Sequence, residues 1–478
     1  MRSSIAVVAF VLVGSLLLSQ SALAGRSLSQ IEYALFKNPY ASVEADLRVL
    51  VAHGDLAAMR VLGDVLASTG GGTQRERVRL YQASFADGRG EVRALASMAR
   101  MMENDAYRGK RYKAYFQQAL NQYPLQRDLE TLSTSLNIFL IYPELFAPGL
   151  AADLIQLHRR SCLINCATEL YQAVLAGQQG EQEKADRLYR QAVLVDERAV
   201  ERYYRFLADR QNELFPLFAQ QLAPQMTAMP AASVHHIGVV LDRIADLWRA
   251  DERIAEQRRR RQALAAETKL EPQQPGVIAA SEALRREALG WINDAAARKW
   301  VPAMATRFYF MSSYPDNFSG AEAMQLIDEV AEQDPDRAKR LRVSALMVTN
   351  WSTLDPAKAH ELIQQMIAEG KPGGYALLGD LYSRGGLDEP DQQRALAIFA
   401  DVAKLDAPSA YFSQARIYAS GPAICNDPTR AYALAGAAYE LGVERARSLM
   451  KELAVQLTDD ERARADAMRV DILRELDI

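Results

Sequence analysis

The strongest constraint on the fold of this 478-residue chain is an internal repeat of 36 residues. Amphipathic stretches of helical period begin at equal steps, and a second phase follows the same step with small residues or proline. The two series are Ala323, Ala359, Ala395 and Ala431, and Pro302, Ala338, Gly374, Ala410 and Ala446. Repeats of this length are typical of helical solenoids, in which each two-helix unit buries its apolar face against its neighbours. The sequence therefore predicts an all-α solenoid.

The unit from 374 to 409 shows how each hairpin is built. Its first helix is predicted to end at Gly385, because glycine enters the left-handed conformation without a steric cost. Pro390 is predicted to open the second helix, where its missing N–H leaves no hydrogen bond unmade. In other units Asp355 and Asp427 each precede a proline, which is the pattern of an acidic N-cap with proline at the first helical position.

The order of small residue, Leu-Gly, Tyr and Gly in residues 375–385 resembles the Sel1-like branch of the tetratricopeptide superfamily. The same pattern occurs in residues 61–68, followed by three glycines and a second helical stretch. This resemblance implies a right-handed superhelical solenoid of Sel1-like or TPR-like helical hairpins. Such solenoids use an extended concave surface to bind other proteins.

Residues 1–24 have the three parts of a secretory signal peptide. These parts are Arg2, an apolar run over residues 5–18, and small residues that end at Ala24. The run is about 14 residues long, whereas a bilayer span takes about 20, so we expect cleavage after Ala24 rather than a retained anchor. No cysteine lies near the cleavage site to be acylated as in a lipoprotein. We therefore expect a periplasmic protein, either free or peripherally attached to the outer membrane.

Residues 256–276 interrupt the packed-helix pattern with four consecutive arginines at 258–261 and a proline-containing stretch. The predicted division is an N-terminal helical-repeat solenoid at 25–255, a charged linker at 256–276, and C-terminal Sel1-like repeats at 277–478. The arginine run is either a solvated helix end or a docking patch for an acidic partner. Thr458 precedes Glu461 by three residues, the spacing of a capping box, which predicts a helix that caps the end of the stack.

The formal net charge of −4 argues against a general surface for nucleic acid or anionic membranes. Of the three cysteines, Cys162 and Cys166 are four residues apart. On an unbroken helix this spacing places the Cβ atoms about 5–6 Å apart. A disulfide prefers a Cβ separation of about 3.5–4.5 Å, so a bridge requires a turn between them. The sequence is therefore compatible both with a disulfide between these two cysteines and with a pair of buried free thiols.

The histidines do not form an evident catalytic or metal-binding group. The sequence from His360 to Gln364 matches the HExxH zinc motif except that glutamine stands at the second ligand position. His235 and His236 are adjacent and point in different directions on any regular element, so we expect them at the surface or at a helix end. The sequence predicts a protein that is not an enzyme and that has no cofactor or metal.

Candidate binding residues are the polar side chains between core positions of the first helix in each unit. Asp380, Arg384 and Arg416 are of this kind, and Asp380 and Arg416 occupy the same register of the repeat. Repeat phase predicts that these side chains face the concave groove. We expect protein partners to bind there.

Over most of residues 40–470 the chain resembles the AlgK family, the periplasmic scaffolds of bacterial alginate secretion. The blocks that carry the resemblance are 141–146, the unit containing Gly379, 426–428 with 431–433, and 457–458 with 462–463. The resemblance implies a scaffold that binds an outer-membrane porin and periplasmic polysaccharide-synthesis proteins, with at most indirect contact with the polysaccharide. Members of that family are typically lipoproteins, and this chain lacks the acylated cysteine. An alternative is a periplasmic Sel1-type regulator that binds a membrane sensor kinase.

Overall fold

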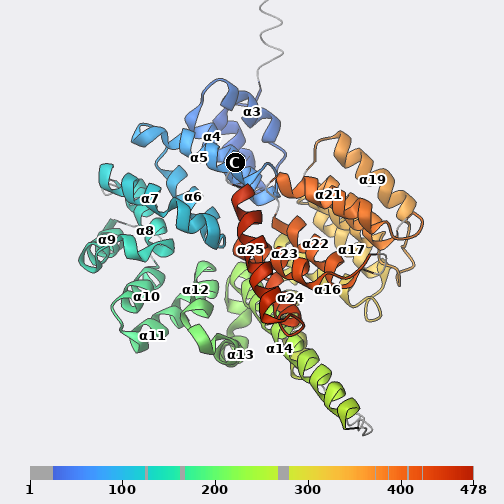
Figure 1. Ribbon diagram of the computed structural model, residues 1–478. Helices are drawn as coiled ribbons and strands as arrows, with labels where there is room; N and C mark the ends of the chain where they lie inside the picture. The colour runs from blue at the N-terminus through green and yellow to red at the C-terminus, as the bar shows by residue number, and fades with distance from the viewer. Residues whose placement is uncertain are drawn as a thin grey trace, which may run out of the picture.

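Figure 1 shows the computed structural model of the chain, in which helices follow one another as stacked hairpins. The structure describes residues 25–123, 128–161, 167–266, 279–371, 373–385, 387–405, 408–421 and 424–476. Within these residues the regular secondary structure is helical throughout, without a strand, which confirms the predicted all-α solenoid. No helix in this part of the chain has both the length and the apolar character to cross a membrane. The predicted signal peptide, Cys162 and Cys166 lie outside the described residues.

The first half of the stack contains twelve α-helices among the described residues. They are α2 (Leu28–Lys37), α3 (Glu44–Ala52), α4 (Leu56–Thr69), α5 (Gln74–Phe85), α6 (Arg93–Met102), α7 (Ala106–Gln122), α8 (Leu129–Ile141), α9 (Pro148–Ser161), α10 (Glu169–Gln178), α11 (Gln182–Val193), α12 (Arg198–Phe206) and α13 (Gln211–Leu222). Short 3-10 helices join some of them, at η1 (Ala86–Gly88), η2 (Pro143–Leu145), η3 (Ala208–Arg210) and η4 (Ala223–Ala228).

The second half of the stack begins with a helix of 35 residues, α14 (Ala231–Ala265). The helices that follow are α15 (Ala280–Ala297), α16 (Val301–Ser313), α17 (Gly320–Ala331), α18 (Pro335–Ala345), α19 (Pro356–Ala368), α20 (Gly374–Arg384), α21 (Gln392–Lys404), α22 (Pro408–Ser420), α23 (Pro428–Glu440), α24 (Ala446–Ala454) and α25 (Asp459–Glu475). The 36-residue step of the sequence is therefore the step from one hairpin to the next.

In the C-terminal hairpins an aspartate at the start of the second helix makes two hydrogen bonds that hold the hairpin together. The Asp391 side chain accepts a hydrogen bond from the Arg394 N–H at the start of α21, and its own N–H donates to Tyr382 O near the end of α20 at 3.0 Å. The Asp427 N–H donates in the same way to Tyr418 O at 2.9 Å, 36 residues later. One residue thus satisfies an otherwise unpaired N–H of a helix start and ties that helix to the previous one.

The prediction for Pro390 was wrong in its position. Asp391 is the N-cap of α21, so Pro390 lies before the cap rather than at the first helical position. Its ring instead lies close to Gly385, where an added Cβ would be 2.8 Å from the proline Cδ. Gly385 has φ +77°, as predicted for a helix end. Asp355 and Asp427 are N-caps with proline at the start of the helix, also as predicted.

Arginine and tyrosine pair across the same hairpins at the repeat spacing. The guanidinium of Arg394 lies 4.0 Å from the ring centre of Tyr382, and that of Arg430 lies 4.7 Å from the ring centre of Tyr418. Each such contact contributes about 0.5–1 kcal/mol at partly exposed sites. These tyrosines therefore serve the packing of the repeat.

Glycine in the first helix of a hairpin lets an aromatic ring from the second helix approach closely. A Cβ added at Gly379 would lie 2.8 Å from ring atoms of Phe399, and one added at Gly63 would lie 2.6 Å from Tyr81. Real Cβ atoms do not come this close to other heavy atoms, so these positions need glycine. The N-terminal and C-terminal repeats thus use the same contact.

The buried core continues across the predicted division of the solenoid. Residues 256–265 extend α14, and residues 267–278 lie outside the described part of the chain. The helices on either side, α14 and α15, pack against each other, and one buried cluster runs from Val78 to Trp351. A second cluster fills the C-terminal repeats between Ala395 and Leu473. The division into two solenoids at 256–276 stays a prediction.

The ends of the stack meet. The Asn38 side chain donates a hydrogen bond to Gln333 O at 3.0 Å, and the Arg75 guanidinium donates to Leu476 O at 2.9 Å. Tyr107 packs against the C-terminal cluster. In Figure 1 the end of α25 lies against the N-terminal helices, in agreement with these contacts. The helices therefore form a superhelical turn that closes on itself.

The last helix has the capping box that its sequence predicts. Thr458 accepts a hydrogen bond from the N–H of Glu461, and the Glu461 carboxylate accepts one from the N–H of Thr458. The helix packs on α23 and its end reaches α5. It thus covers one end of the stack and also touches the other.

Candidate functional site

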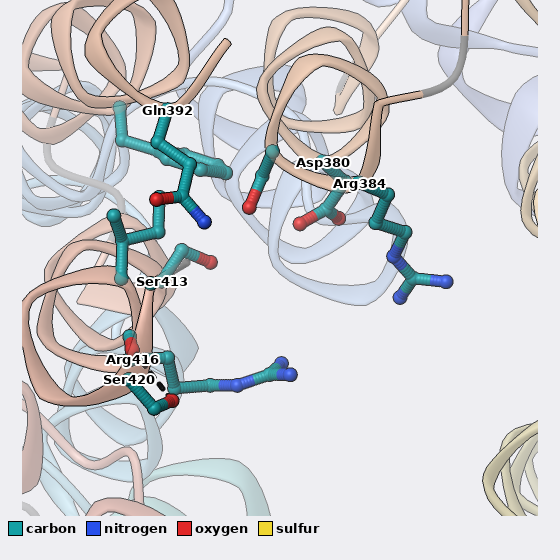
Figure 2. Close-up of a pocket in the computed structure, with 10 residues that line it drawn as sticks. Asp380, Arg384, Gln392, Ser413, Arg416 and Ser420 are labelled. Atoms are coloured by element: carbon teal, nitrogen blue, oxygen red, sulfur yellow. Dashed lines mark hydrogen bonds between the residues drawn. The ribbon is translucent and has the colours of Figure 1, made fainter. Parts of the chain in front are cut away.

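A cavity of about 230 Å³ lies between α20, α21 and α22, and all three predicted binding residues line it. Asp380 and Arg384 project from α20, and Arg416 projects from α22. In Figure 2 the side chains of Arg384 and Arg416 extend from different helices toward the same space, with the Asp380 carboxylate near Arg384. The other lining residues are Ser383, Gln392, Phe399, Ser413, Ile417, Ser420 and Gly421. The structure brings the predicted residues together, and their binding role stays a prediction.

The charged groups of this cavity have no partner of their own. Among the described residues, no hydrogen bond or ion pair engages the side chains of Asp380, Arg384 and Arg416. Both arginine side chains are exposed, whereas Asp380 is half-buried. Charges that stabilise a fold are normally paired, particularly when they are partly buried. These three charged groups are therefore available to a ligand.

The N-terminal repeat shows what a paired version of the same position looks like. Asp64 is the counterpart of Asp380, because both follow the glycine that contacts the aromatic ring. Asp64 accepts hydrogen bonds at 3.1 Å from the Tyr81 hydroxyl and at 3.1 Å from the Arg60 guanidinium. At the place of Tyr81 the C-terminal unit has Phe399, which has no hydroxyl. The exchange of tyrosine for phenylalanine therefore leaves the Asp380 carboxylate available.

Electrostatics favour an anionic ligand in this cavity. Burial raises the pKa of the Asp380 carboxyl above its ordinary value, and the charges of Arg384 and Arg416 partly oppose that rise. The cavity carries a net positive charge whether Asp380 is ionised or protonated, because two guanidinium groups face one carboxyl group. Guanidinium groups bind carboxylates and phosphates through paired hydrogen bonds.

Repeat phase did not select the neutral polar groups of the cavity. Ser420 stands 36 residues after Arg384, and Ser413 precedes Arg416 by three residues on the same helix face, so both had a signal in the sequence. Gln392 had none. It is 3% exposed at the start of α21, and Gly421 leaves room for it, since an added Cβ there would lie 2.5 Å from the Gln392 Oε1.

A second cavity of about 200 Å³ lies between α14, α16 and the start of α24. Its central charge is Arg285, which is 3% exposed and contacts Asp242, Asp246 and the hydroxyl of Tyr314. Burial raises the pKa of Asp246, and the adjacent Asp242 raises it further, while the charge of Arg285 opposes both effects. This network satisfies its own charges, so it supports the structure of the inner surface rather than offering free groups.

Tyr309 lines the second cavity and lies within electrostatic range of Asp380 in the first. It projects from α16 into the second cavity, where it faces Arg445 from the start of α24. Burial raises its pKa; Arg340 of α18, Arg337 and Arg445 oppose the rise, and Asp380 of the first cavity adds to it. Side chains from α16, α18, α20 and α24 therefore lie within electrostatic range of this tyrosine.

These helices form the inner layer of the C-terminal superhelix. In the order α16, α18, α20, α22 and α24, each contacts the next. The first and the last nevertheless line one cavity, so the layer curves back on itself and its inner surface is concave. We call this surface the arginine groove and define it by Tyr309, Arg340, Asp380, Arg384, Arg416 and Arg445.

A third cavity, of about 500 Å³, lies in the N-terminal repeats and differs in its charges. Its arginines are largely bound within the chain. Arg60 contacts Asp64 and Glu91, and Arg93 contacts Glu91 and Glu130. The charges of this cavity are therefore largely neutralised, unlike those of Arg384 and Arg416.

No protein-family profile matches the chain, and no curated protein matches it. Among solved structures, the chain is similar to a protective antigen of uropathogenic Escherichia coli strains displaying an SLR fold, with 15% identity and a TM-score of 0.25 over 91% of this chain and 95% of the other. It is also similar to a Sel1 repeat protein from Oxalobacter formigenes, with 18% identity and a TM-score of 0.25 over 57% of this chain and 99% of the other. At these scores the likenesses carry no argument, and the solenoid fold stands on the helices themselves.

Proposed function

We propose that this chain is a periplasmic, Sel1-like scaffold without catalytic activity, which binds proteins of an exopolysaccharide secretion complex. In this proposal it holds an outer-membrane porin and periplasmic polysaccharide-synthesis proteins together. The observation that carries the binding role is the group of unpaired charges in the cavity formed by Asp380, Arg384 and Arg416. The resemblance to alginate-secretion scaffolds supplies the class of partner.

Three further features support a binding role over a catalytic one. The residues that line the cavity include serines but no histidine, cysteine or second carboxylate to activate them. The groove is formed by five helices of one layer, which suits an extended partner better than a small substrate. Its arginines Arg384, Arg416 and Arg445 are exposed rather than enclosed.

Affinity capture of the tagged, exported protein from gently solubilised envelopes tests this proposal. We expect an outer-membrane porin and polysaccharide-synthesis proteins among the captured proteins. A tagged periplasmic protein without helical repeats, expressed at the same level, is the control. Capture of a membrane sensor kinase without the porin would overturn the secretion proposal in favour of a regulatory role, and capture of nothing beyond the control would overturn both.

A further inference from the structure

We infer that the arginine groove binds an extended acidic peptide segment of a protein partner, with acidic side chains at about every third residue. This inference rests on the proposed function and specifies the chemistry of the partner. Its evidence is the placement of the arginines along the groove, their lack of partners within the chain, and the spacing of the helices that carry them.

The groove contains four arginines that the chain pairs weakly or not at all. Among the described residues, the guanidinium groups of Arg340, Arg384 and Arg416 have no hydrogen bond or ion pair. Arg445 is 3.8 Å from Asp242, but that carboxylate is nearer to Arg285, and the Arg445 side chain is 60% exposed. The groove of a chain with a net charge of −4 thus carries a local excess of positive charge. An acidic partner is complementary to this surface.

The spacing of the helices favours an extended peptide. Arg340, Arg384 and Arg416 come from α18, α20 and α22, which are consecutive helices of the inner layer. Packed helix axes lie about 8–10 Å apart. An extended peptide advances about 3.3–3.6 Å per residue, so about three residues cover one step. Acidic side chains at about every third position would therefore come within reach of the long arginine side chains on successive helices.

The neutral groups of the groove suit a peptide backbone. The serine hydroxyls of Ser413 and Ser420 can donate and accept hydrogen bonds, as peptide groups require. Asp380 can accept from a backbone N–H in the place where Asp64 accepts from the Tyr81 hydroxyl. The exposed ring of Tyr309, 45% accessible, offers an apolar contact between the charged positions. When ionised, Asp380 would repel a polyuronate chain, which carries a carboxylate on every sugar, whereas a peptide can present a backbone N–H there.

Fluorescence anisotropy with the full mature chain tests this inference. The probe is a labelled peptide of about 12 residues with glutamate at every third position and serine and glycine between. We expect the probe to bind, and the double variant Arg384→Gln/Arg416→Gln to bind it at least about tenfold more weakly. The control Arg258→Gln/Arg261→Gln removes two exposed arginines at the end of α14 and should change the affinity by less than about twofold.

Two further comparisons make the test specific. A peptide of the same composition with its glutamates consecutive should bind more weakly than the spaced probe. The variant Phe399→Tyr should also weaken binding, because its hydroxyl would donate to Asp380 as that of Tyr81 does to Asp64. Circular dichroism spectra of all variants should match that of the parent chain.

Several outcomes would overturn the inference. The inference falls if the spaced probe does not bind, or if the peptide with consecutive glutamates binds equally well. It also falls if the α14 control loses affinity, or if a uronate oligosaccharide of equal charge binds more strongly in an arginine-dependent way. If affinity capture still recovers the porin with Arg384→Gln/Arg416→Gln while the peptide fails to bind, the scaffold proposal stands and only the acidic-peptide inference falls.

Discussion

His235 is the residue whose environment makes the clearest pH-dependent prediction. It was expected at the surface or at a helix end, but it is 7% exposed in the interior of α14, with Nε2 2.9 Å from the Thr306 hydroxyl. Nδ1 is buried without a hydrogen-bond partner among the described residues. Burial, assisted by the charge of His236, lowers the pKa of His235 to about 4. The pair of adjacent histidines in the sequence did not indicate this burial. His235 is buried because it lies on the apolar face of α14, together with Val234 and Ile237.

We predict that the free energy of unfolding falls as the pH falls from about 6.5 toward 4. The unfolded chain binds a proton at His235 near pH 6.5, whereas the folded chain resists protonation until about pH 4. The full contribution is about 3 kcal/mol. Urea unfolding at several pH values, compared between the parent chain and His235→Gln, measures it. The same pH dependence in both proteins would contradict the prediction, because all other titrating groups are shared.

The candidate site shows how far single residues could be predicted. Repeat phase selected Asp380, Arg384 and Arg416, and the structure places them around one cavity. Repeat phase did not show that these side chains lack hydrogen-bond partners, because pairing depends on side chains of other helices. Phe399, for example, stands where the N-terminal repeat has a tyrosine that binds the aspartate. Nor could it select Arg340, whose place in the groove follows from the curvature of the inner layer. The repeat position of a residue predicts which face of its helix it lies on, whereas the contacts of that face depend on the packing of the other helices.

At the scale of the helix, glycine has opposite consequences at two positions. We predict that Gly379→Ala destabilises the chain by about 1–3 kcal/mol, because the new Cβ would lie 2.8 Å from the buried ring of Phe399. Gly290 lies inside α15 with no atom near its missing Cβ. Gly290→Ala should stabilise by about 0.5–1 kcal/mol through helix propensity alone. Urea unfolding of both variants checks this, and a shift of the same sign in both would show that the contact with Phe399 does not limit the position.

Most helix boundaries followed from local chemistry and were predictable. Asp427 followed by proline gave a helix start, Gly385 gave a helix end, and Thr458 with Glu461 gave a capping box. The segment at 256–276 begins with a continuation of α14, in agreement with the solvated helix end expected there. The four arginines at 258–261 are good helix formers, so the helix extends past the last buried residue, Ile254.

At the scale of the whole molecule, the closure of the superhelix was beyond prediction from the repeat. A 36-residue step specifies how each hairpin packs on the next, but the curvature that brings residues 38 and 333 together accumulates from small angles between many units. The closing contacts involve side chains and carbonyl groups without a shared pattern, such as Asn38 with Gln333 and Arg75 with Leu476. Within the C-terminal half, α24 packs on α14, and Arg445 at its start lines one cavity with α16, so the arginine groove is concave.

The turn at Gly442 tests whether this closure depends on a close backbone contact. Gly442 has φ +97°, and an added Cβ would lie 2.8 Å from the carbonyl oxygen of Asn104. Asn104 lies in the N-terminal repeats, between α6 and α7. The loop that contains Asn104 is held by Arg205, whose guanidinium donates to the Asn104 Oδ1 at 2.6 Å. Because this loop is tied to α12, we expect Gly442→Ala to relieve the clash by separating the C-terminal repeats from it.

The predicted result for Gly442→Ala is a larger radius of gyration in small-angle X-ray scattering and faster hydrogen exchange in α7 and α24. Gly180→Ala is the matched control, because Gly180 has φ +79° but no atom within 4 Å of the missing Cβ. Both variants bear the left-handed backbone strain, about 1–2 kcal/mol, and only Gly442→Ala adds the clash. If the two variants have the same radius of gyration, the turn at Gly442 does not hold the superhelix closed. If only Gly442→Ala expands and also loses affinity for the acidic probe, the concavity of the arginine groove depends on the meeting of the two ends of the stack.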